Sequence, residues 1–317
     1  MNHKNWRIVF MGTPEFAVAS LDALLKAGAN IVAVITAPDK PGGRGMGMQQ
    51  SAVKKFALQK NLPVLQPEKL KNEAFLEELR SYKADLQIVV AFRMLPELVW
   101  NMPAKGTINL HGSLLPHYRG AAPINWAVIN GEKETGVTTF LLQQQIDTGN
   151  ILMQANTPID AEENVGEVYE RLMQLGAKLL VKTVEQYAEG TLSPKSQEHF
   201  GIMETDIKHA PKIQTSDCKV DWNKSAEYNH DFIRGLSPFP TAFTQLHGKK
   251  LKIFQARIEA STNVSVAGTV SSDGKTYLTF ACKDANLHVT ELQLEGKKRM
   301  AVADFLRGYK WPTEEKS

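Results

Sequence analysis

Residues 107–120 read TINLHGSLLPHYRG, and the rest of the chain is best interpreted outward from them. The first residues alternate between apolar and polar side chains, which predicts a β-strand rather than a helix. Gly112 ends that strand, and Pro116 keeps the next residues out of regular structure. Asn109 and His111 are two residues apart, so a strand projects both from one face. They are either ordinary polar residues at a strand end or an amide and an imidazole converging on one substrate atom.

The preceding chain alternates between short apolar runs and helical patterns. Residues 7–11, 30–36 and 86–92 are apolar runs without polar alternation, and residues 17–26 have helical spacing. Such runs are typical of parallel strands that are covered on both faces. We therefore expect a doubly wound, mostly parallel, Rossmann-like α/β sheet in an N-terminal catalytic domain, residues 1–190. The first turn reads Gly-Thr-Pro and lacks the dinucleotide fingerprint.

A glycine-rich loop, residues 38–48, interrupts this rhythm after the second strand and contains Lys40 and Arg44. It is either a mobile surface connection or part of a binding site. The second reading has a physical basis, because ligands of open α/β sheets bind at the carboxyl ends of the strands.

Further along, strands are expected at residues 136–142 and 151–157, with the longest helix at 164–189. The turn between these strands contains Asp147 in the sequence Asp-Thr-Gly. Aspartic proteases also use Asp-Thr-Gly, but they need two such carboxylates. Only one copy lies in this α/β context, so Asp147 is either a plain turn residue or a single functional carboxylate.

Residues 191–210 lose all periodicity and are expected to be a linker. Residues 211–317 then show short strands and turns, which predict a small OB-like β-barrel as a C-terminal domain. The expected strands are residues 242–246, 251–258, 268–270, 277–282 and 287–294.

Charge also differs between the two halves. Residues 1–206 hold 20 Lys/Arg and 22 Asp/Glu, whereas residues 207–317 hold 17 Lys/Arg and 12 Asp/Glu. A basic C-terminal half suggests a polyanionic partner, although an excess of this size also occurs in domains that bind nothing charged.

The only cysteines, Cys218 and Cys282, stand alone, so neither a metal site nor a disulfide framework is expected. No apolar run approaches the ~20 residues needed to span a bilayer. The sequence begins with a short polar stretch and shows neither a signal peptide nor an arginine-rich transit segment. We expect a cytoplasmic protein that does not bind membranes.

Together, Asn109, His111 and Asp147 supply a carbonyl-polarising amide, a proton-handling imidazole and a carboxylate. A substrate that brings its own amine makes a serine or cysteine nucleophile unnecessary. Ser113 lies nearby, but it is not within a Gly-x-Ser-x-Gly elbow.

These motifs resemble the folate-dependent formyltransferase family over nearly the whole chain. The similarity rests on the Asn-x-His-Gly-Ser-Leu-Leu-Pro segment, the following Tyr-Arg-Gly-Ala-Ala-Pro, and the segments at residues 10–14, 134–138, 147–149 and 220–222. Within the family, the Gly-Gly-Arg-Gly loop and the C-terminal barrel are similar to those of members that act on charged initiator tRNA.

The resemblance implies that 10-formyltetrahydrofolate donates a formyl group to the methionine α-amine of initiator tRNA. Asn109 would hold the formyl oxygen, His111 would exchange protons, and Asp147 would orient His111 or a water. The folate would lie against Ser113, Leu114, Leu115 and Pro116. The tRNA acceptor stem would meet the loop of Lys40 and Arg44, and the protein would act as a monomer without a metal.

One segment departs from the family pattern. Arg93 stands after the fourth strand where a glycine is common, in a loop that is one residue shorter. That loop borders the expected pterin pocket, so the family's backbone contacts there do not carry over directly.

Three alternatives remain. The chain could formylate a purine ribonucleotide or an aminosugar nucleotide, or it could be an RNA-binding factor with an idle α/β half. A purine ribonucleotide enzyme has no reason to carry a basic barrel, whereas an aminosugar enzyme can have one. The intact trio of Asn109, His111 and Asp147 disfavours the idle factor.

Overall fold

The computed structural model describes residues 5–42, 47–259 and 265–311. These residues form two compact units, and each is assembled from separate stretches of chain. Unit 1 comprises the described residues up to Gly120 together with Thr135–Thr157 and Glu170–His209. Unit 2 comprises Ala121–Glu134, Pro158–Tyr169 and the described residues from Ala210 onward.

The elements between residues 7 and 206 are, in chain order, β1 (Arg7–Gly12), α1 (Glu15–Lys26), β2 (Asn30–Ile35), β3 (Lys40–Pro41), β4 (Met48–Gln49), α2 (Ala52–Gln59), β5 (Val64–Leu65), α3 (Glu73–Ser81), β6 (Leu86–Val90), α4 (Glu97–Trp100), β7 (Thr107–His111), β8 (Arg119–Gly120), α5 (Pro123–Ile129), β9 (Glu134–Leu141), β10 (Ile151–Pro158), α6 (Val165–Glu189), and the 3₁₀ helices η2 (Gln197–Phe200) and η3 (Glu204–Asp206).

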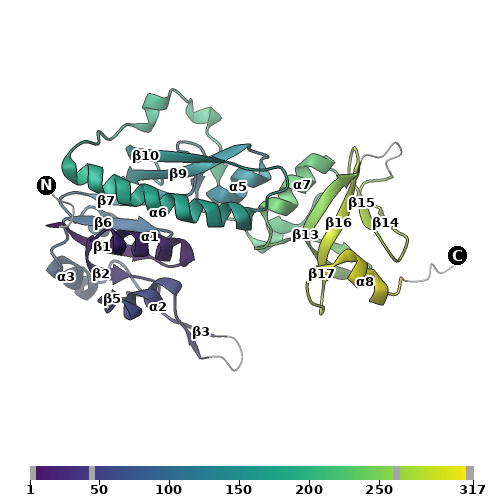
Figure 1. The fold of residues 1–317 in the computed structure, drawn as a ribbon, viewed down its shortest axis with the longest axis horizontal. Coiled ribbons are helices and arrows are strands. Elements are labelled where there is room, and N and C mark those ends of the chain that lie inside the picture. Colours follow the sequence, from purple (N-terminus) through teal and green to yellow (C-terminus); the bar gives the residue numbers. More distant parts are fainter. Residues whose placement is uncertain (1–4, 43–46, 260–264, 312–317) are drawn as a thin grey trace. The chain divides into compact units, whose positions relative to one another are not determined.

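Unit 1 is built on a seven-stranded sheet in the order β10-β9-β7-β6-β1-β2-β5. The pairs β1–β2, β1–β6, β2–β5 and β6–β7 are parallel, whereas β7–β9 is antiparallel. The expected doubly wound, mostly parallel sheet is therefore confirmed. Strand β7 lies inside the sheet between β6 and β9, so its backbone is held on both sides (Figure 1).

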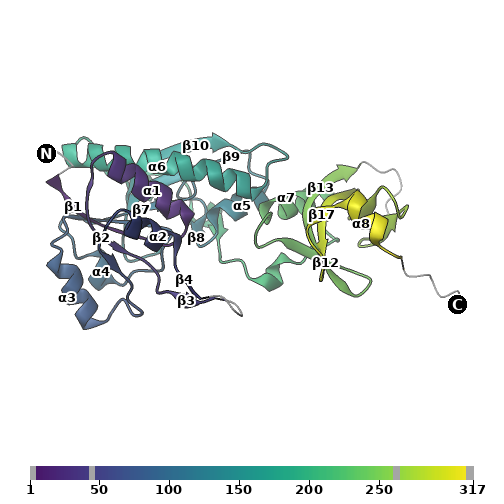
Figure 2. The same ribbon diagram turned by 60° about the horizontal axis from the view of Figure 1, so that its bottom comes forward.

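Helices bury the strands because the strands are apolar on both faces. Helix α3 packs Phe75, Leu76 and Leu79 into a cluster that also contains residues of β1 and β2. Long α6 approaches β7 so closely that a Cβ on Gly176 would lie 2.9 Å from a Leu110 methyl group. Both views show α6 running along β9 and β10 (Figures 1 and 2). This packing makes β7 a rigid base for its polar residues.

The remaining elements are β11 (His209–Ala210), η4 (Thr215–Cys218), α7 (Ala226–Gly235), β12 (Ala242–Leu246), β13 (Lys249–Glu259), β14 (Val270–Ser272), β15 (Leu278–Ala281), β16 (Asn286–Leu294), β17 (Met300–Ala301) and α8 (Val302–Gly308).

Unit 2 carries an antiparallel sheet in the order β12-β13-β16-β15-β14, with β17 paired to β16. The predicted OB-like C-terminal domain agrees with this curled antiparallel sheet. Alternate residues of the strands enter one hydrophobic cluster, which α7 and α8 close with Phe232, Ile233, Phe305 and Leu306. Ile129 of α5 belongs to the same cluster. Helix α5 therefore forms part of this core although it precedes most of it in the chain.

The sequence predicted the long elements well and the short ones poorly. It missed the pairs β3–β4 and β8–β11, strand β17 and helix α8, and β14 begins at Val270, later than expected. Two-residue strands are too short to carry a periodic signal. Within the described ranges, no helix is long and apolar enough to cross a membrane.

Nearly all of the polar segment expected as a linker, residues 191–210, belongs to unit 1. The Lys195 backbone bridges to Ile151, and the backbone N–H of Tyr118 donates to the carbonyl of Lys208. The Gln197 side chain is also buried. Polar residues that are held by hydrogen bonds leave no apolar pattern, so the sequence did not indicate these contacts.

Candidate active site

Strand β7 positions two of the three candidate catalytic side chains. Asn109 and His111 pair across to Phe140 and Thr138 of β9, respectively, so both have fixed places in the register. Because they are two residues apart, their side chains leave the same face of the sheet. The amide and the imidazole are thereby presented together, as their spacing predicted.

The His111 ring is buried, with only 7% of the residue exposed. Its Nε2 lies 2.8 Å from the carbonyl oxygen of Tyr118. A carbonyl oxygen only accepts hydrogen bonds, so Nε2 carries a hydrogen and donates it. In the neutral ring, Nδ1 is consequently the nitrogen that can take up a proton. The rings of His111 and Phe140 lie nearly perpendicular to each other, with their centroids 6.5 Å apart.

Asp147 faces that nitrogen. Its Oδ2 lies 3.8 Å from His111 Nδ1, which is too long for a hydrogen bond but close enough for an ion pair with a protonated ring. The same oxygen accepts a hydrogen bond of 2.9 Å from the backbone N–H of Gly120. The Asp147 carboxylate is therefore held beside the imidazole, where it can stabilise a positively charged His111 ring.

The turn that carries Asp147 needs an unusual backbone. Asp147 has φ of 55°, in the left-handed region, which aspartate tolerates better than most residues. Two residues later, a Cβ on Gly149 would lie 1.7 Å from the carbonyl oxygen of Leu141. Only glycine fits at that point, which explains the Asp-Thr-Gly sequence without any protease chemistry.

The Asn109 side chain is half-buried, and it has no hydrogen-bond partner among the residues that the structure describes. An amide that lies on the same strand face as His111 and keeps its donors uncommitted can bind an oxygen of a substrate. All three candidate catalytic residues are thus found in unit 1, and His111 and Asp147 are brought together.

The segment of Ser113 to Pro116 follows β7 directly. Its backbone is anchored by Thr138 of β9, whose hydroxyl donates to the Ser113 carbonyl at 2.7 Å and accepts from the Leu115 N–H at 3.1 Å. Gln154 adds a 2.9 Å hydrogen bond to the Leu115 carbonyl. Ser113 is fully buried, and its hydroxyl donates to the carbonyl of His117. Its side chain therefore serves the local structure.

Leu114 and Pro116 complete this segment. Leu114 is half-buried, and it packs so tightly over Gly136 that a Cβ there would lie 2.5 Å from a Leu114 methyl group. Pro116 is buried. The segment offers a fixed backbone and a partly accessible apolar side chain next to His111.

Lys40 is exposed on the short β3–β4 hairpin, and Arg44 lies outside the described residues. The base of the hairpin is tied down by Asp39, which pairs with Lys54 and accepts a hydrogen bond from Gln66. The hydrogen bonds from Gln66 and Lys54 hold the pKa of Asp39 below its usual range. The hairpin thus leaves the sheet from a fixed point after β2.

Arg93 takes a structural part in the loop after β6. Its guanidinium donates to the carbonyls of Glu68, at 2.8 Å, and Pro67. Burial lowers the pKa of Arg93. Arg93 therefore ties the loop after β6 to the loop after β5.

Several residues of the site were missed by sequence reasoning. The backbone groups of Tyr118 and Gly120 hold His111 and Asp147, and the Gln197 side chain donates to the carbonyls of Asp147 and Gly149. Backbone contacts have no residue-type signature. Gln197 lies in the segment without periodicity, so no neighbouring sequence pattern identified it as a site residue.

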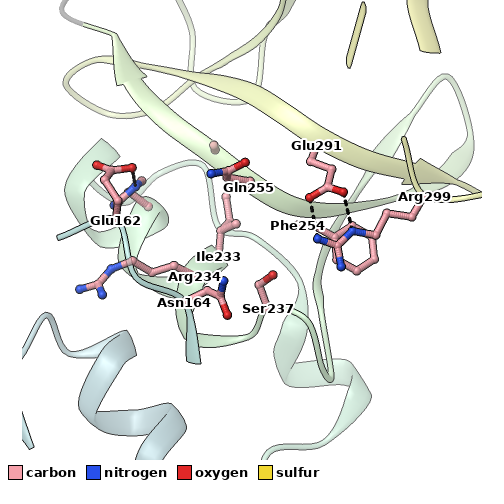
Figure 3. Close-up of a pocket in the computed structure, with 11 residues that line it drawn as sticks. Glu162, Asn164, Ile233, Arg234, Ser237, Phe254, Gln255, Glu291 and Arg299 are labelled. Atoms are coloured by element: carbon pink, nitrogen blue, oxygen red, sulfur yellow. Dashed lines mark hydrogen bonds and ion pairs between the residues drawn. The ribbon is translucent and has the colours of Figure 1, made fainter. Parts of the chain in front are cut away.

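Unit 2 contains a polar cavity of about 110 Å³ between α7, β13 and the turn before α6 (Figure 3). Its charges are already paired. Arg299 makes two hydrogen bonds with Glu291, and Arg234 pairs with Asp231. No member of the catalytic trio lines it. Across the described ranges, no cluster of three or more metal-binding side chains is found.

Comparison with known proteins identifies the family of this chain. The profile described as formyl transferase matches residues 6–184, and the profile of the formyl transferase C-terminal domain matches residues 212–310. The methionyl-tRNA formyltransferase of Parabacteroides distasonis is 54% identical over 316 residues, covering 98% of each chain. That of Bacteroides thetaiotaomicron is 51% identical over 315 residues, also covering 98% of each.

Solved structures show the same fold at lower identity. HypX from Aquifex aeolicus, in complex with tetrahydrofolic acid, gives a TM-score of 0.64 at 17% identity, covering 95% of this chain and 47% of that one. An N-formyltransferase from Helicobacter canadensis, with folinic acid and dTDP-3-aminofucose, gives 0.64 at 18% identity, covering 90% and 98%. With its first profile match covering more than half of its length, the chain belongs to the formyl transferase family.

Proposed function

We propose that this chain transfers a formyl group from 10-formyltetrahydrofolate to the α-amine of methionyl initiator tRNA, producing formylmethionyl-tRNA for translation initiation. The observation that carries the proposal is the facing pair of His111 and Asp147, with the uncommitted amide of Asn109 on the same strand face as His111. The methionyl-tRNA formyltransferases that match nearly all of the chain support this choice of acceptor.

The bound folate supplies an activated formyl group on its N10 nitrogen. The amide of Asn109 donates a hydrogen bond to the formyl oxygen and stabilises the negative charge that builds up there as the amine attacks. Nδ1 of His111 takes up the proton that the amine releases and returns it to N10 as the carbon–nitrogen bond breaks. The carboxylate of Asp147 stabilises the charged imidazole between these steps.

The residues fit a folate and its formyl group. Next to the trio, the backbone of Ser113 to Pro116 is fixed by Thr138 and Gln154, so its position does not depend on a ligand. A preorganised segment binds with a smaller entropy cost than a mobile one. We assign Ser113, Leu114, Leu115 and Pro116 to folate binding, mainly through their backbone and through the Leu114 side chain.

For tRNA, we assign Lys40 and Arg44, from the glycine-rich sequence at residues 38–48, to the acceptor stem and the basic C-terminal domain to the tRNA body. By function, we assign residues 1–190 to catalysis, 191–210 to the connection and 211–317 to tRNA binding; this division does not coincide with the two compact units. The protein acts in the cytoplasm as a monomer. Phosphate contacts release counterions, so tRNA affinity should fall by ~0.7–0.9 log units per contact for each tenfold rise in salt.

A second acceptor deserves a direct test because solved relatives include sugar N-formyltransferases. Purified protein should be given 10-formyltetrahydrofolate with one of three acceptors: charged initiator tRNA, a purine ribonucleotide or an aminosugar nucleotide. We expect formylation of the charged tRNA alone, and none by the His111→Ala variant. Formylation of a nucleotide acceptor in preference to tRNA would overturn the proposal.

A further inference from the structure

Gln197 occupies a buried position next to the turn of Asp147, and only 5% of it is exposed. Its Nε2 donates to the carbonyl of Asp147 at 2.8 Å and to the carbonyl of Gly149 at 3.0 Å. A glutamine amide nitrogen has two hydrogens, so both donors are used. The side chain therefore braces the two ends of the Asp-Thr-Gly turn.

The other end of the amide is equally committed. Oε1 of Gln197 accepts from Nε of Arg119 at 3.1 Å and from its Nη2 at 2.8 Å. The remaining Nη1 of Arg119 donates to both carboxylate oxygens of Glu204. Carbonyl oxygens only accept and a guanidinium only donates, so this site requires one side chain that does both. Glutamine meets that need, whereas glutamate and lysine do not.

These bonds close a ring around Asp147. Arg119 is followed directly by Gly120, whose N–H holds the Asp147 carboxylate at 2.9 Å. Gln197 therefore holds the backbone of Asp147 directly. It also binds Arg119, the neighbour of Gly120, and Gly120 in turn binds the Asp147 carboxylate. A movement of Gln197 would shift Asp147 with respect to His111 Nδ1.

We propose that Gln197 is a positioning residue, which sets the place of the Asp147 carboxylate beside His111. This inference rests on the proposed function, because it assumes that Asp147 assists the transfer. The inference also has a structural half, which is that Gln197 holds the Asp147 turn. That half does not depend on which substrate receives the formyl group.

The direct test is Gln197→Glu, which keeps the size of the side chain and the acceptor for Arg119. It removes both donors and sets a carboxylate against two carbonyl oxygens. Misplacing a reacting group by about 1 Å can cost ~10²-fold in rate. We expect kcat to fall by up to that factor, while the binding of an unreactive folate stays unchanged.

A matched control is the reverse exchange at the next residue. Glu198 is exposed, and Glu198→Gln should leave kcat and folate binding at their wild-type values. A Gln197→Glu protein that turns over as fast as wild type would overturn the inference.

A double-mutant cycle tests whether the effect passes through Asp147. In an Asp147→Asn background, Gln197→Glu should cause little further loss of kcat, because the carboxylate it positions is already gone. If the two losses in log kcat add in full, Gln197 does not act through Asp147. Should Gln197→Glu fold poorly, Arg119→Lys replaces it in the cycle, since lysine cannot reproduce the two-pronged contact.

Hydrogen exchange at the Gly120 amide gives a readout that needs no substrate. Exchange should be faster in Gln197→Glu and in Asp147→Ala than in wild type, and unchanged in Glu198→Gln. Unchanged exchange in Gln197→Glu would overturn the structural half. If wild-type protein failed to formylate charged tRNA, the proposed function would be wrong. The exchange test would still show whether Gln197 holds Asp147 in place.

Discussion

His111 and Asp147 face each other, yet the molecule holds them by different means. His111 belongs to β7, an inner strand whose backbone is paired on both sides. Asp147 belongs to a turn that is held by a backbone N–H, a glutamine and the lack of a side chain on Gly149.

The difference separates two ways of building a precise site. A strand position is fixed by the whole sheet, so one substitution at its periphery moves it little. A turn position depends on a few individual hydrogen bonds, and each can be removed by one substitution. The following experiments compare these two modes of support.

The largest effect is expected at the strand itself. His111→Ala should lower kcat by ~10²–10⁴-fold, because the general acid–base group is lost, and should leave folate binding nearly intact. Single-turnover formyl transfer measures this. His199→Ala, at an exposed histidine, is the control. Near-normal turnover in the His111 variant would remove it from the mechanism.

Asn109→Ala comes next. Removal of one oxyanion donor costs ~10²–10³-fold in kcat, and the strand should keep its place because the side chain has no partner among the described residues. Steady-state kinetics beside Asn101→Ala, an exposed asparagine, would separate kcat from KM. A change in KM alone would reassign Asn109 to substrate binding.

Thr138→Val tests a strand residue that supports a loop. It leaves the Ser113 carbonyl and the Leu115 N–H without their partner, and buried unpaired groups cost ~1–3 kcal/mol. We expect lower thermal stability and a higher KM for folate. Thr191→Val, at an exposed threonine, should have little effect. An unchanged KM for folate would show that residues 113–116 do not form part of the folate site.

Lys40→Ala probes the hairpin. One lost phosphate contact should reduce the salt dependence of tRNA binding by ~0.7–0.9 in the log–log slope and lower kcat/KM a few-fold. Binding measured over a range of salt concentrations, beside Lys55→Ala, checks this. An unchanged slope would mean that Lys40 does not meet a phosphate.

The smallest effect is expected at Glu204→Gln. The Glu204 side chain is 73% exposed, and exposed ion pairs contribute ~0–1 kcal/mol. Turnover should stay within about two-fold of wild type because Gln197 still holds Arg119. A large loss would show that the support of the Asp147 turn extends to the protein surface.

The contrast between strand and turn also explains which site residues could be predicted from the sequence. Asn109 and His111 were found because strand periodicity places residues i and i+2 on one face. Asp147 was found by its turn and by the family resemblance, while its partners Gly120 and Gln197 were not. Their contacts join residues that are 27 and 50 positions apart, and no local pattern encodes such distances.

Secondary structure was likewise predictable where it depends on local pattern and not where it depends on long-range contacts. Long elements such as α6 carry several turns of periodic apolar residues, so the sequence indicated them. The two-residue pair of β8 and β11 exists because residues 119–120 and 209–210 meet in space. A pairing that rests on tertiary contact alone could not be predicted from either segment.

The interleaved assembly of unit 2 limits how this enzyme could exchange modules with its relatives. Its core takes Ile129 from α5, and the Trp126 indole donates to the Pro211 carbonyl at 2.8 Å. A swap of everything after residue 209 would therefore leave α5 facing a foreign barrel. A working chimaera would have to transplant residues 121–134 and 158–169 together with the C-terminal part, so gene fusion at a single junction is a poor route to a folded hybrid.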